Sequence, residues 1–290
     1  MWTLDGRTAL LTGASRGIGP ILAETLAAEG MRLTISSRTE APLEQLAQRL
    51  RSKGREVKVI PANLELSEEC ENLVKRIMEA GEGIDVLVNN AGMISVLPYH
   101  RIPTNDILRE VALNLAAPML LSRLLLPQML KRRRGHIVNI VSIAGEVPLP
   151  YEISYCATKA GLISFTRSFR SEYRGSGVSA SAISPGFIRD VGMAFDFSRQ
   201  AGRPLPKSLG GCLSGEVAAA VVRAIRKDLP EIIVNRPPIR PFIAFLRLFP
   251  TFGEKLLCRS TFYKVNREAA LINLEAGGRY TGGSVAPEKE

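Results

Sequence analysis

The sequence predicts an α/β protein with one doubly wound parallel sheet and helices on both of its faces. Short apolar runs alternate with helical patterns over residues 1–235, and the connections between them are short. The runs are apolar at consecutive positions, which is typical of parallel strands that are buried on both faces. A glycine-rich turn joins the first run to the first helical segment, at the kind of place where such a sheet binds a ligand.

The alternation predicts the strands and the main helices in order. Strands are expected at residues 8–11, 32–36, 56–61, 84–89, 136–142, 178–184 and 231–235. Helices are expected from the glycine turn to about residue 30 and at 41–53, 67–80, 104–133, 151–174 and 214–227. Pro118 and Pro127 are expected to kink or divide the long helix, because proline removes a backbone hydrogen bond.

Composition excludes several classes of site. The 290 residues can bury one large core, and the four cysteines include no C-x-x-C pair. Only His100 and His136 supply imidazoles, so neither a metal site nor Ser-His-Asp hydrolysis is expected. The N-terminus lacks the pattern of a signal peptide, and no apolar run approaches the roughly 20 residues of a spanning helix. We therefore expect a cytoplasmic protein with reduced thiols.

Basic charge is concentrated with aromatic residues near the C-terminus. The net charge of +10 is compatible with nucleic acid or an anionic membrane, but no nucleic-acid motif is present and no nucleic-acid partner is expected. Residues 236–276 form a basic, Phe-rich, amphipathic helical extension, which either lies peripherally on an anionic membrane or packs on its own domain or a second subunit. Its aromatic residues are Phe242, Phe245, Phe249, Phe252 and Phe262. Residues 277–290 are expected to be a disordered tail.

The glycine-rich turn is suited to a bound dinucleotide. Gly13, Gly17 and Gly19 allow the backbone to approach a pyrophosphate where a helix begins and its N–H groups are free. No carboxylate follows the second strand, where selection of NAD usually requires one; Arg38 stands there instead, and Arg16 lies in the glycine turn. Two guanidiniums favour a 2′-phosphate, and so NADP(H) over NAD(H), unless both are solvated loop residues.

Tyr155 and Lys159 lie one helical turn apart and therefore share a face. Lowering a tyrosine pKa by about three units requires roughly 4 kcal/mol. One ammonium about 4 Å away supplies about that much at an effective dielectric constant near 20. The pair is thus sufficient to make Tyr155 an acid–base group, although an isolated pair at this spacing would more often be a surface feature.

The pair does not stand alone. TGASRGIG, NNAG, Asn114, Ser142 and YCATK follow one another in this order, and together they resemble the short-chain dehydrogenase/reductase family over about residues 5–235. The resemblance implies a Rossmann-type fold and hydride transfer between a nicotinamide and a carbonyl or alcohol carbon. It also implies that Tyr155 is the acid–base, that Ser142 positions the substrate oxygen, that Lys159 tunes Tyr155 and holds the ribose, and that Asn114 holds a relay water.

The resemblance also implies a set of cofactor-binding residues. They are Gly13, Ser15, Arg16, Gly17, Ile18, Gly19, Arg38, Asn63, Leu64, Asn90, Ala91, Gly92, Tyr155, Lys159, Pro185, Gly186 and Ile188. The chain departs from the family in two places. Asn63-Leu64 replaces a usual Asp-Leu, and an Asn carbonyl can still accept a hydrogen bond from adenine. Asp190 replaces a common Thr, and its carboxylate is unfavourable near phosphates unless it turns away or binds the carboxamide.

Residues 190–212 lack a clean periodicity and precede the last helix–strand unit. Met193, Phe195 and Phe197 are apolar in this loop-like setting. We expect a lid that presents these side chains to the substrate, with a plain surface excursion as the alternative.

The function expected from these features is an NADP(H)-dependent oxidoreductase that acts on a lipophilic ketone or secondary alcohol. One alternative is a ketoacyl-thioester reductase whose substrate is attached to an acidic carrier. Another is a non-enzymatic nucleotide sensor, which the intact Ser142, Tyr155 and Lys159 set disfavours. The expected partners are the small substrate, possible anionic membrane contact through the extension, and a second copy of the chain in a homo-oligomer.

Overall fold

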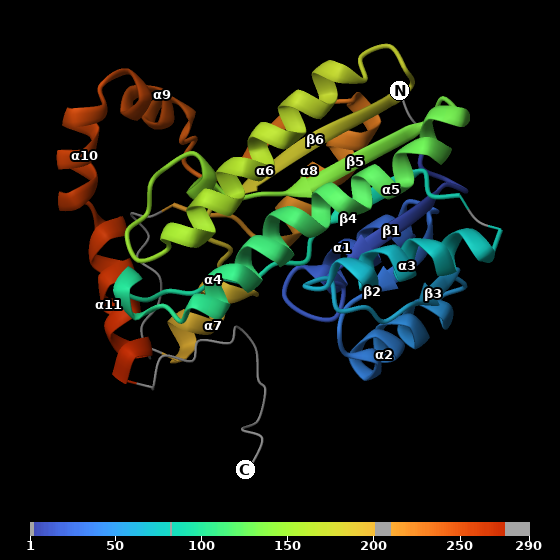
Figure 1. The fold of residues 1–290 in the computed structure, drawn as a ribbon, viewed down its shortest axis with the longest axis horizontal. Helices are drawn as coiled ribbons and strands as arrows, with labels where there is room; N and C mark the ends of the chain where they lie inside the picture. Colours follow the sequence, from blue (N-terminus) through green and yellow to red (C-terminus); the bar gives the residue numbers. More distant parts are fainter. Residues whose placement is uncertain (1–2, 82, 201–209, 276–290) are drawn as a thin grey trace.

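The protein is a doubly wound α/β structure, as the sequence predicts (Figure 1). The computed structural model describes residues 3–81, 83–200 and 210–275. All seven strands of its sheet are parallel, in the order β3-β2-β1-β4-β5-β6-β7. The strands are β1 (Thr8–Thr12), β2 (Arg32–Ser36), β3 (Val57–Val59), β4 (Val86–Asn89), β5 (Gly135–Ile140), β6 (Val178–Pro185) and β7 (Glu231–Val234). The order reverses between β1 and β4, which is where such a sheet opens a ligand crevice.

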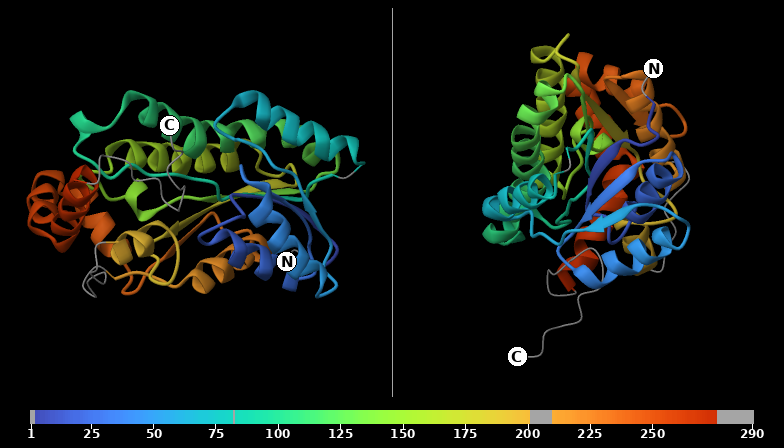
Figure 2. Two further views of the ribbon diagram at one scale, coloured as in Figure 1. Left: turned by 90° about the horizontal axis from the view of Figure 1, so that it is seen from below. Right: turned by 90° about the vertical axis from the view of Figure 1, so that its right-hand side faces the viewer.

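Two helical layers cover the sheet (Figures 1 and 2). One layer holds α1 (Gly19–Ala28), α2 (Glu40–Arg51) and α8 (Ser214–Lys227). The other holds α3 (Ser67–Glu79), α5 (Ala117–Lys131) and α6 (Ile153–Glu172). Each layer closes its own half of the core: Leu22, Leu46 and Val221 pack on one face of the sheet, and Leu73, Leu125 and Phe169 on the other. The consecutive apolar positions of the strands follow from this two-sided burial.

The long helix is divided at a π-helical turn, Ala112–Ala116, between α4 (Thr104–Val111) and α5. Helical structure continues without a gap through Pro118, directly after this turn, and through Pro127, so a division of the helix at Pro127 is wrong. By length and composition, Thr104–Lys131 is sufficient to span a bilayer. Its inward residues Leu121, Leu125 and Met129 lie in the core against the sheet, and the core helix of a globular protein meets the same criterion.

The segment after β6 is more regular than the sequence indicates. Instead of a loop, Met193–Gln200 forms helix α7. Met193 and Phe197 are one turn apart and pack against the cluster around Tyr155. Two other expectations, the remainder of the lid at 201–209 and the tail at 277–290, lie outside the described residues.

Within the described residues, three helices follow β7: α9 (Arg240–Leu248), α10 (Pro250–Arg259) and α11 (Thr261–Glu275). Their inward side chains Ile243, Leu257 and Ala270 join Ile143 and Leu149 in one apolar cluster. The extension therefore packs on its own domain. Helices α9 and α10 lie at one extremity of the molecule, away from the sheet (Figure 1).

Candidate active site

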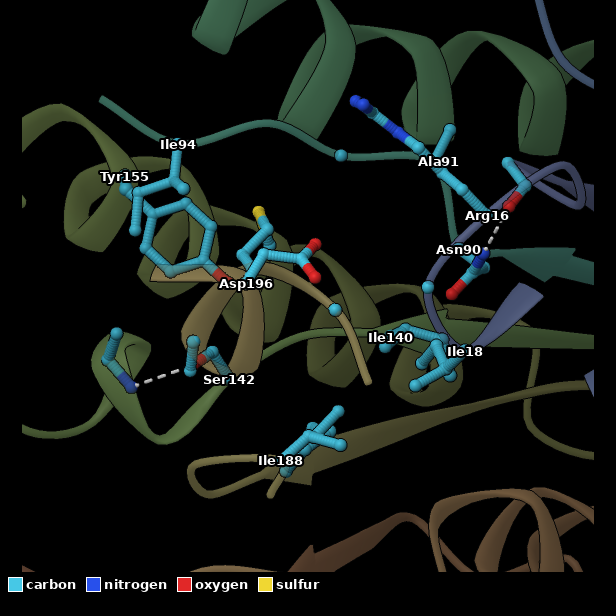
Figure 3. A pocket seen from close by; sticks show the side chains of 18 of the residues that line it. Arg16, Ile18, Asn90, Ala91, Ile94, Ile140, Ser142, Tyr155, Ile188 and Asp196 are labelled. Atoms are coloured by element: carbon cyan, nitrogen blue, oxygen red, sulfur yellow. Dashed lines mark hydrogen bonds between the residues drawn. The ribbon is translucent and has the colours of Figure 1, made fainter. Parts of the chain in front are cut away.

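A cavity of about 600 Å³ opens at the carboxyl ends of the strands. The glycine turn, Asn90 and Ala91 lie at one end of it, and Tyr155 and Ile94 at the other (Figure 3). Most of the expected site residues line this cavity. They are Gly13, Ser15, Arg16, Gly17, Ile18, Arg38, Leu64, Asn90, Ala91, Gly92, Ser142, Tyr155, Lys159, Pro185, Gly186 and Ile188. Residues that are far apart in the sequence therefore meet in one place, because the carboxyl ends of parallel strands share an edge of the sheet.

The glycine turn has the geometry of a phosphate cradle. Gly13 and Gly17 have φ of +65° and +58°, a region that favours glycine. A Cβ at Gly13 would lie 2.7 Å from the Cα of Ala91, so the close approach of β1 and β4 also requires glycine. Helix α1 begins without a side-chain cap, but Pro20 carries no N–H and the Gly19 N–H donates to the carbonyl of Arg16 over 3.1 Å, so the glycine turn before the helix supplies most of the backbone N–H groups for an anion. These features fit the pyrophosphate of a dinucleotide.

A threonine that the sequence analysis missed connects the turn to β4. The backbone N–H groups of Asn90 and Ala91 both donate to Thr12 Oγ1, over 3.0 and 3.1 Å. The Asn90 side chain donates in return to the carbonyls of Thr12 and Gly13, over 3.1 and 3.0 Å. The sequence did offer a signal for this role, because the hydroxyl of Thr12 directly precedes Gly13, the first glycine of the turn. This reciprocal set holds the two walls of the cofactor end together.

Arg38 lies at the cavity in an ion pair with Glu65. Arg38 Nη1 is 2.9 Å from Glu65 Oε1, and the same carboxylate accepts from Arg109 over 2.8 and 3.2 Å. The absence of a carboxylate after β2 is thus partly offset by one that follows β3. Two guanidiniums share that single carboxylate, and Arg38 keeps 47% of its side chain exposed at the cavity rim.

Three expected site residues lie behind the cavity wall, and Asp190 turns away from it. Gly19 packs against Gly13 and Ala14, and the side-chain oxygen Oδ1 of Asn63 accepts from the backbone N–H of Glu65 over 3.3 Å. Asp190 accepts from the backbone N–H and the hydroxyl of Ser214, over 2.9 and 2.6 Å, at the start of α8. The carboxylate that replaces a threonine is therefore a helix-capping group and adds no charge to the phosphate end.

Asn114 is the third residue behind the wall, and the π-helical turn determines its position. Its amide accepts from the backbone N–H of Met93 over 2.9 Å and donates to the carbonyl of Met93 over 2.8 Å and to Thr158 over 3.3 Å. A π-helical turn shifts the backbone ladder by one residue and is common at functional sites. Asn114 thereby braces the segment after β4 against α6, and the relay water remains a prediction.

Ser142, Tyr155 and Lys159 assemble at the substrate end. Ser142 follows β5, and its Oγ accepts from the backbone N–H of Ala144 over 3.1 Å (Figure 3). Tyr155 is 7% exposed, and Lys159 lies one turn further along α6. The Lys159 ammonium is 5.6 Å from the centroid of the Tyr155 ring and donates to the carbonyl of Ile140 over 2.9 Å. The shared face of the pair is therefore confirmed.

Burial dominates the acid–base properties of this group. It raises the pKa of Tyr155 above its usual value, the charge of Glu152 raises the pKa further, and a hydrogen bond with Ser142 opposes both. Burial also lowers the pKa of Lys159 to about 8. The pKa of Tyr155 is therefore raised in the protein alone, because burial disfavours the phenolate, and the tuning of Tyr155 by Lys159 remains a prediction.

The substrate end also contains a pair that the sequence analysis missed. Glu152 and Asn266 line the cavity, and Glu152 Oε1 accepts from the Asn266 amide over 3.0 Å. Met193, Ala194, Asp196 and Phe197 of α7 line it too, whereas Phe195 does not. A carboxylate three residues before Tyr155 was visible in the sequence. Asn266 gave no local signal, because only the packing of α11 brings it there.

The site combines a dinucleotide cradle with the neighbouring hydroxyls of Ser142 and Tyr155. This combination is typical of oxidoreductases that use a nicotinamide cofactor. The sequence profile described as short chain dehydrogenase matches residues 7–201, and the chain belongs to that family. The ketoacyl reductase HetN of Nostoc sp. is 38% identical over 248 residues, which cover 86% of this chain and 85% of HetN. A 3-oxoacyl-[acyl-carrier-protein] reductase of Synechocystis sp. is 35% identical, covering 65% of this chain and 76% of that protein.

Solved structures agree with this assignment. A metagenomic short-chain oxidoreductase in complex with NADP has 30% identity and a TM-score of 0.69, and the match covers 80% of this chain and 98% of the other. A single-residue variant of actinorhodin polyketide ketoreductase with NADPH has 28% identity and a TM-score of 0.70, with 81% and 97% of the two chains covered. The fold, the site and the sequence thus indicate one family of oxidoreductases.

Proposed function

We propose that the protein is an NADP(H)-dependent oxidoreductase that interconverts a lipophilic ketone and its secondary alcohol. The observation that carries this proposal is the position of Tyr155. Its side chain is buried in the cavity wall between the hydroxyl of Ser142 and the ammonium of Lys159, at the far end from the phosphate cradle. A proton donor therefore lies where a carbonyl bound beyond the cradle would place its oxygen.

In the reductive direction, Ser142 holds the carbonyl oxygen by a hydrogen bond and Tyr155 donates a proton to it. NADPH, when bound, supplies the hydride to the carbonyl carbon. Because burial raises its pKa, Tyr155 is protonated at neutral pH, and the ammonium of Lys159 must offset that rise for the proton to leave. Lys159, anchored on the carbonyl of Ile140, holds its ammonium near the ring and stabilises the phenolate as the proton leaves.

The walls around Tyr155 support an apolar substrate. Ile94, Val96 and Leu149 line the cavity on one side, and Met193 and Phe197 of α7 on another. Burial of an apolar substrate against such side chains is worth roughly 25 cal/mol per Å². Preference for NADP(H) is supported by Arg16 and Arg38 at the cavity rim and by the NADP and NADPH in two of the similar structures.

A ketoacyl thioester on a carrier is the second candidate substrate, because one similar sequence is named a 3-oxoacyl-[acyl-carrier-protein] reductase and another a ketoacyl reductase. Turnover of free ketones and of matched carrier-bound thioesters distinguishes the candidates. If kcat/KM is higher for the thioester by about tenfold or more, the carrier-bound thioester replaces the free ketone as the proposed substrate.

The mechanism is tested with Tyr155→Phe. This variant keeps the buried ring and loses the proton donor, so we expect unchanged NADPH affinity and a fall in kcat of about a hundredfold or more. Unchanged turnover would remove Tyr155 from the mechanism. A parent protein that binds NADPH but oxidises it with no member of a broad carbonyl panel would instead support a nucleotide sensor.

We also propose that the protein works in the cytoplasm and docks on an anionic membrane. The docking surface would be the tip of the hairpin that α9 and α10 form, at residues 248–252. Phe245 packs against Phe249 in a tilted arrangement and against Phe252 edge to face, at ring-centroid distances of 5.3 and 5.9 Å. Leu248, Phe249 and Phe252 are 74, 56 and 62% exposed, beside the exposed cations Lys255 and Arg259. Aromatic tips with flanking cations suit the headgroup region. The four free cysteines are typical of a reducing compartment.

A further inference from the structure

A buried carboxyl group that the proposed mechanism does not use lies in the wall of the substrate cavity. Glu152 is 7% exposed and lines the cavity beside Leu149 and Tyr155. The neighbouring wall from α11 is formed by Val265 and Ala269, which are apolar. A carboxyl group in such surroundings costs free energy unless a partner offsets its desolvation.

Asn266 holds this carboxyl group in place. Its amide donates to Glu152 Oε1 over 3.0 Å and to the carbonyl of Pro150 over 3.1 Å, and the residue is 2% exposed. The two residues lie 114 positions apart, so the packing of α11 on the catalytic domain completes the pair. Asn266 also lines the cavity. The substrate end therefore has two polar groups from two elements, fixed against each other.

A purely structural role does not account for Glu152. It occupies the N-cap position of α6, yet its side chain makes no capping hydrogen bond. Among the residues that the structure describes, only Asn266 donates a hydrogen bond to this carboxyl group, and it reaches Oε1. The second oxygen of this carboxyl group accepts no hydrogen bond from the described residues, and Glu152 lines the cavity, so a ligand bound there can supply the missing partner.

The protonation of Glu152 determines which ligand fits. Burial is the main cause that raises its pKa to about 8; the charge of Glu110 acts in the same direction, and the hydrogen bond from Asn266 opposes both. At neutral pH the group is therefore largely a neutral carboxylic acid, which can donate one hydrogen bond and accept another. Such a group can form hydrogen bonds with a hydroxyl or carbonyl oxygen of a ligand, and because it is neutral it does not require a cationic substrate.

We infer that Glu152 and Asn266 form a polar subsite that binds a second oxygen function of the substrate, a hydroxyl or a carbonyl, close to the reacting carbonyl. Glu152 precedes Tyr155 by three residues, about one helical turn, so the two oxygens of the substrate are a few bonds apart. The inference rests on the proposed function and narrows it: the substrate is an otherwise apolar ketone with one further oxygen.

The test compares ring-hydroxylated 1-tetralones with the matching methyl-substituted 1-tetralones, position by position, with NADPH. At the best position, we expect kcat/KM to favour the hydroxyl compound by about tenfold or more. Glu152→Leu should abolish that ratio and Asn266→Ala should reduce it, while Glu152→Gln should keep much of it because an amide also donates and accepts.

Asn273→Ala is the matched control for Asn266→Ala. Asn273 lies on the same helix, is 4% exposed, and donates to the carbonyl of Val96 over 3.0 Å, but it does not line the cavity. Both variants lose one buried amide that ties α11 to the domain. Only Asn266→Ala should change the ratio of kcat/KM between the hydroxyl and methyl compounds. Equal changes in the two variants would mean that the Glu152–Asn266 pair has only a structural role, and would overturn the subsite.

Binding separates this inference from the proposed mechanism. In Tyr155→Phe with saturating NADPH, calorimetry gives the dissociation constants of the same hydroxyl and methyl compounds without turnover. Tighter binding of the hydroxyl compound, lost on adding Glu152→Leu, supports the subsite even if no tetralone is reduced. Equal affinities at every ring position, or binding of neither compound, would overturn the subsite whatever the activity of the parent protein.

Discussion

Single side chains at the site depend on contacts that their sequence neighbours do not reveal. Asn114 is a poor helix former in the middle of a long helix, and the π-helical turn gives its amide partners on the segment after β4 and on α6. Asp190 is unfavourable near phosphates by residue type, and it caps α8 instead. In both cases the sequence shows an unusual residue type, but the hydrogen-bond partners of Asn114 and Asp190 are known only from the fold.

Cofactor preference is testable at one residue. Replacing Arg38 with Ala removes a guanidinium at the cavity rim, so we expect KM for NADPH to rise about tenfold or more and KM for NADH to change little. Arg49→Ala is the control, because Arg49 is an exposed arginine of α2 paired only with Glu24 among the described residues. Equal effects on the two cofactors would exclude Arg38 from recognition of a 2′-phosphate.

The protonation of Glu152 predicts a pH dependence of stability. Because burial raises its pKa from 4.5 to about 8, the folded protein binds a proton between these values that the unfolded chain has released. The free energy of unfolding contributed by this group is therefore largest below pH 4.5 and is lost as pH rises towards 8, by up to about 4 kcal/mol. Glu152→Gln should lose less stability than the parent between about pH 5 and pH 8.

Chemical denaturation at about pH 5, 6, 7 and 8 measures this difference, and Glu254→Gln, at an exposed position on α10, is the control. Parallel pH profiles of the parent and Glu152→Gln would contradict the raised pKa. Glu110, Tyr155 and Cys156 are the titratable neighbours. Burial and the charge of Glu152 raise the pKa values of Tyr155 and Cys156, so both groups stay protonated between pH 5 and 8, and Glu110 is present in both proteins.

Among the elements, α7, α9, α10 and α11 contribute most that the β-α alternation did not predict. Met193 and Phe197 of α7 show the one-turn spacing of a helix, but eight residues are too few for periodicity to distinguish a helix from a loop. The three C-terminal helices share one apolar cluster with Ile143, Leu149 and Tyr155. Helices α7 and α11 line the cavity, so part of the proposed substrate end lies outside the repeating β-α units.

Membrane docking is testable on the hairpin of α9 and α10. Replacing Phe249 and Phe252 together with Ser removes two exposed aromatic side chains, each worth roughly 1.5–3 kcal/mol when buried. We expect cosedimentation with phosphatidylserine-containing vesicles to fall by about tenfold or more. Leu108→Ser, at a 62% exposed leucine on α4, is the control and should have no effect.

A parent protein that remains in the supernatant with anionic vesicles at low salt would refute docking. Equal loss of binding in Leu108→Ser would show that the contact is not made by the hairpin.

At the scale of the whole molecule, the cofactor end and the substrate end are joined by one cavity. β1, β2 and β4 with their loops form the first end, and β5, α6, α7 and α11 form the second. Both helical layers are packed on the same sheet, so occupancy of the cradle stabilises the entire domain rather than one loop.

NADPH should therefore raise the melting temperature of the protein. At a concentration about a hundred times its dissociation constant, it contributes about 2.7 kcal/mol, which corresponds to roughly 5–10 °C for a domain of this size. NADH at the same concentration should raise it less. Differential scanning fluorimetry makes the comparison, and equal shifts with the two cofactors would contradict a preference for NADPH.

The sequence by itself determined the sheet and the reactive residues, because both depend on local signals. Consecutive apolar positions indicate a buried strand, glycines at 13 and 17 indicate a left-handed turn, and the spacing of Tyr155 and Lys159 places them on one face. The tertiary structure decided what surrounds them. The pKa of Tyr155, the cap at Asp190, the ion pair at Arg38 and the contact of Asn266 with Glu152 depend on burial and on residues far apart in the chain, and no local pattern encodes these.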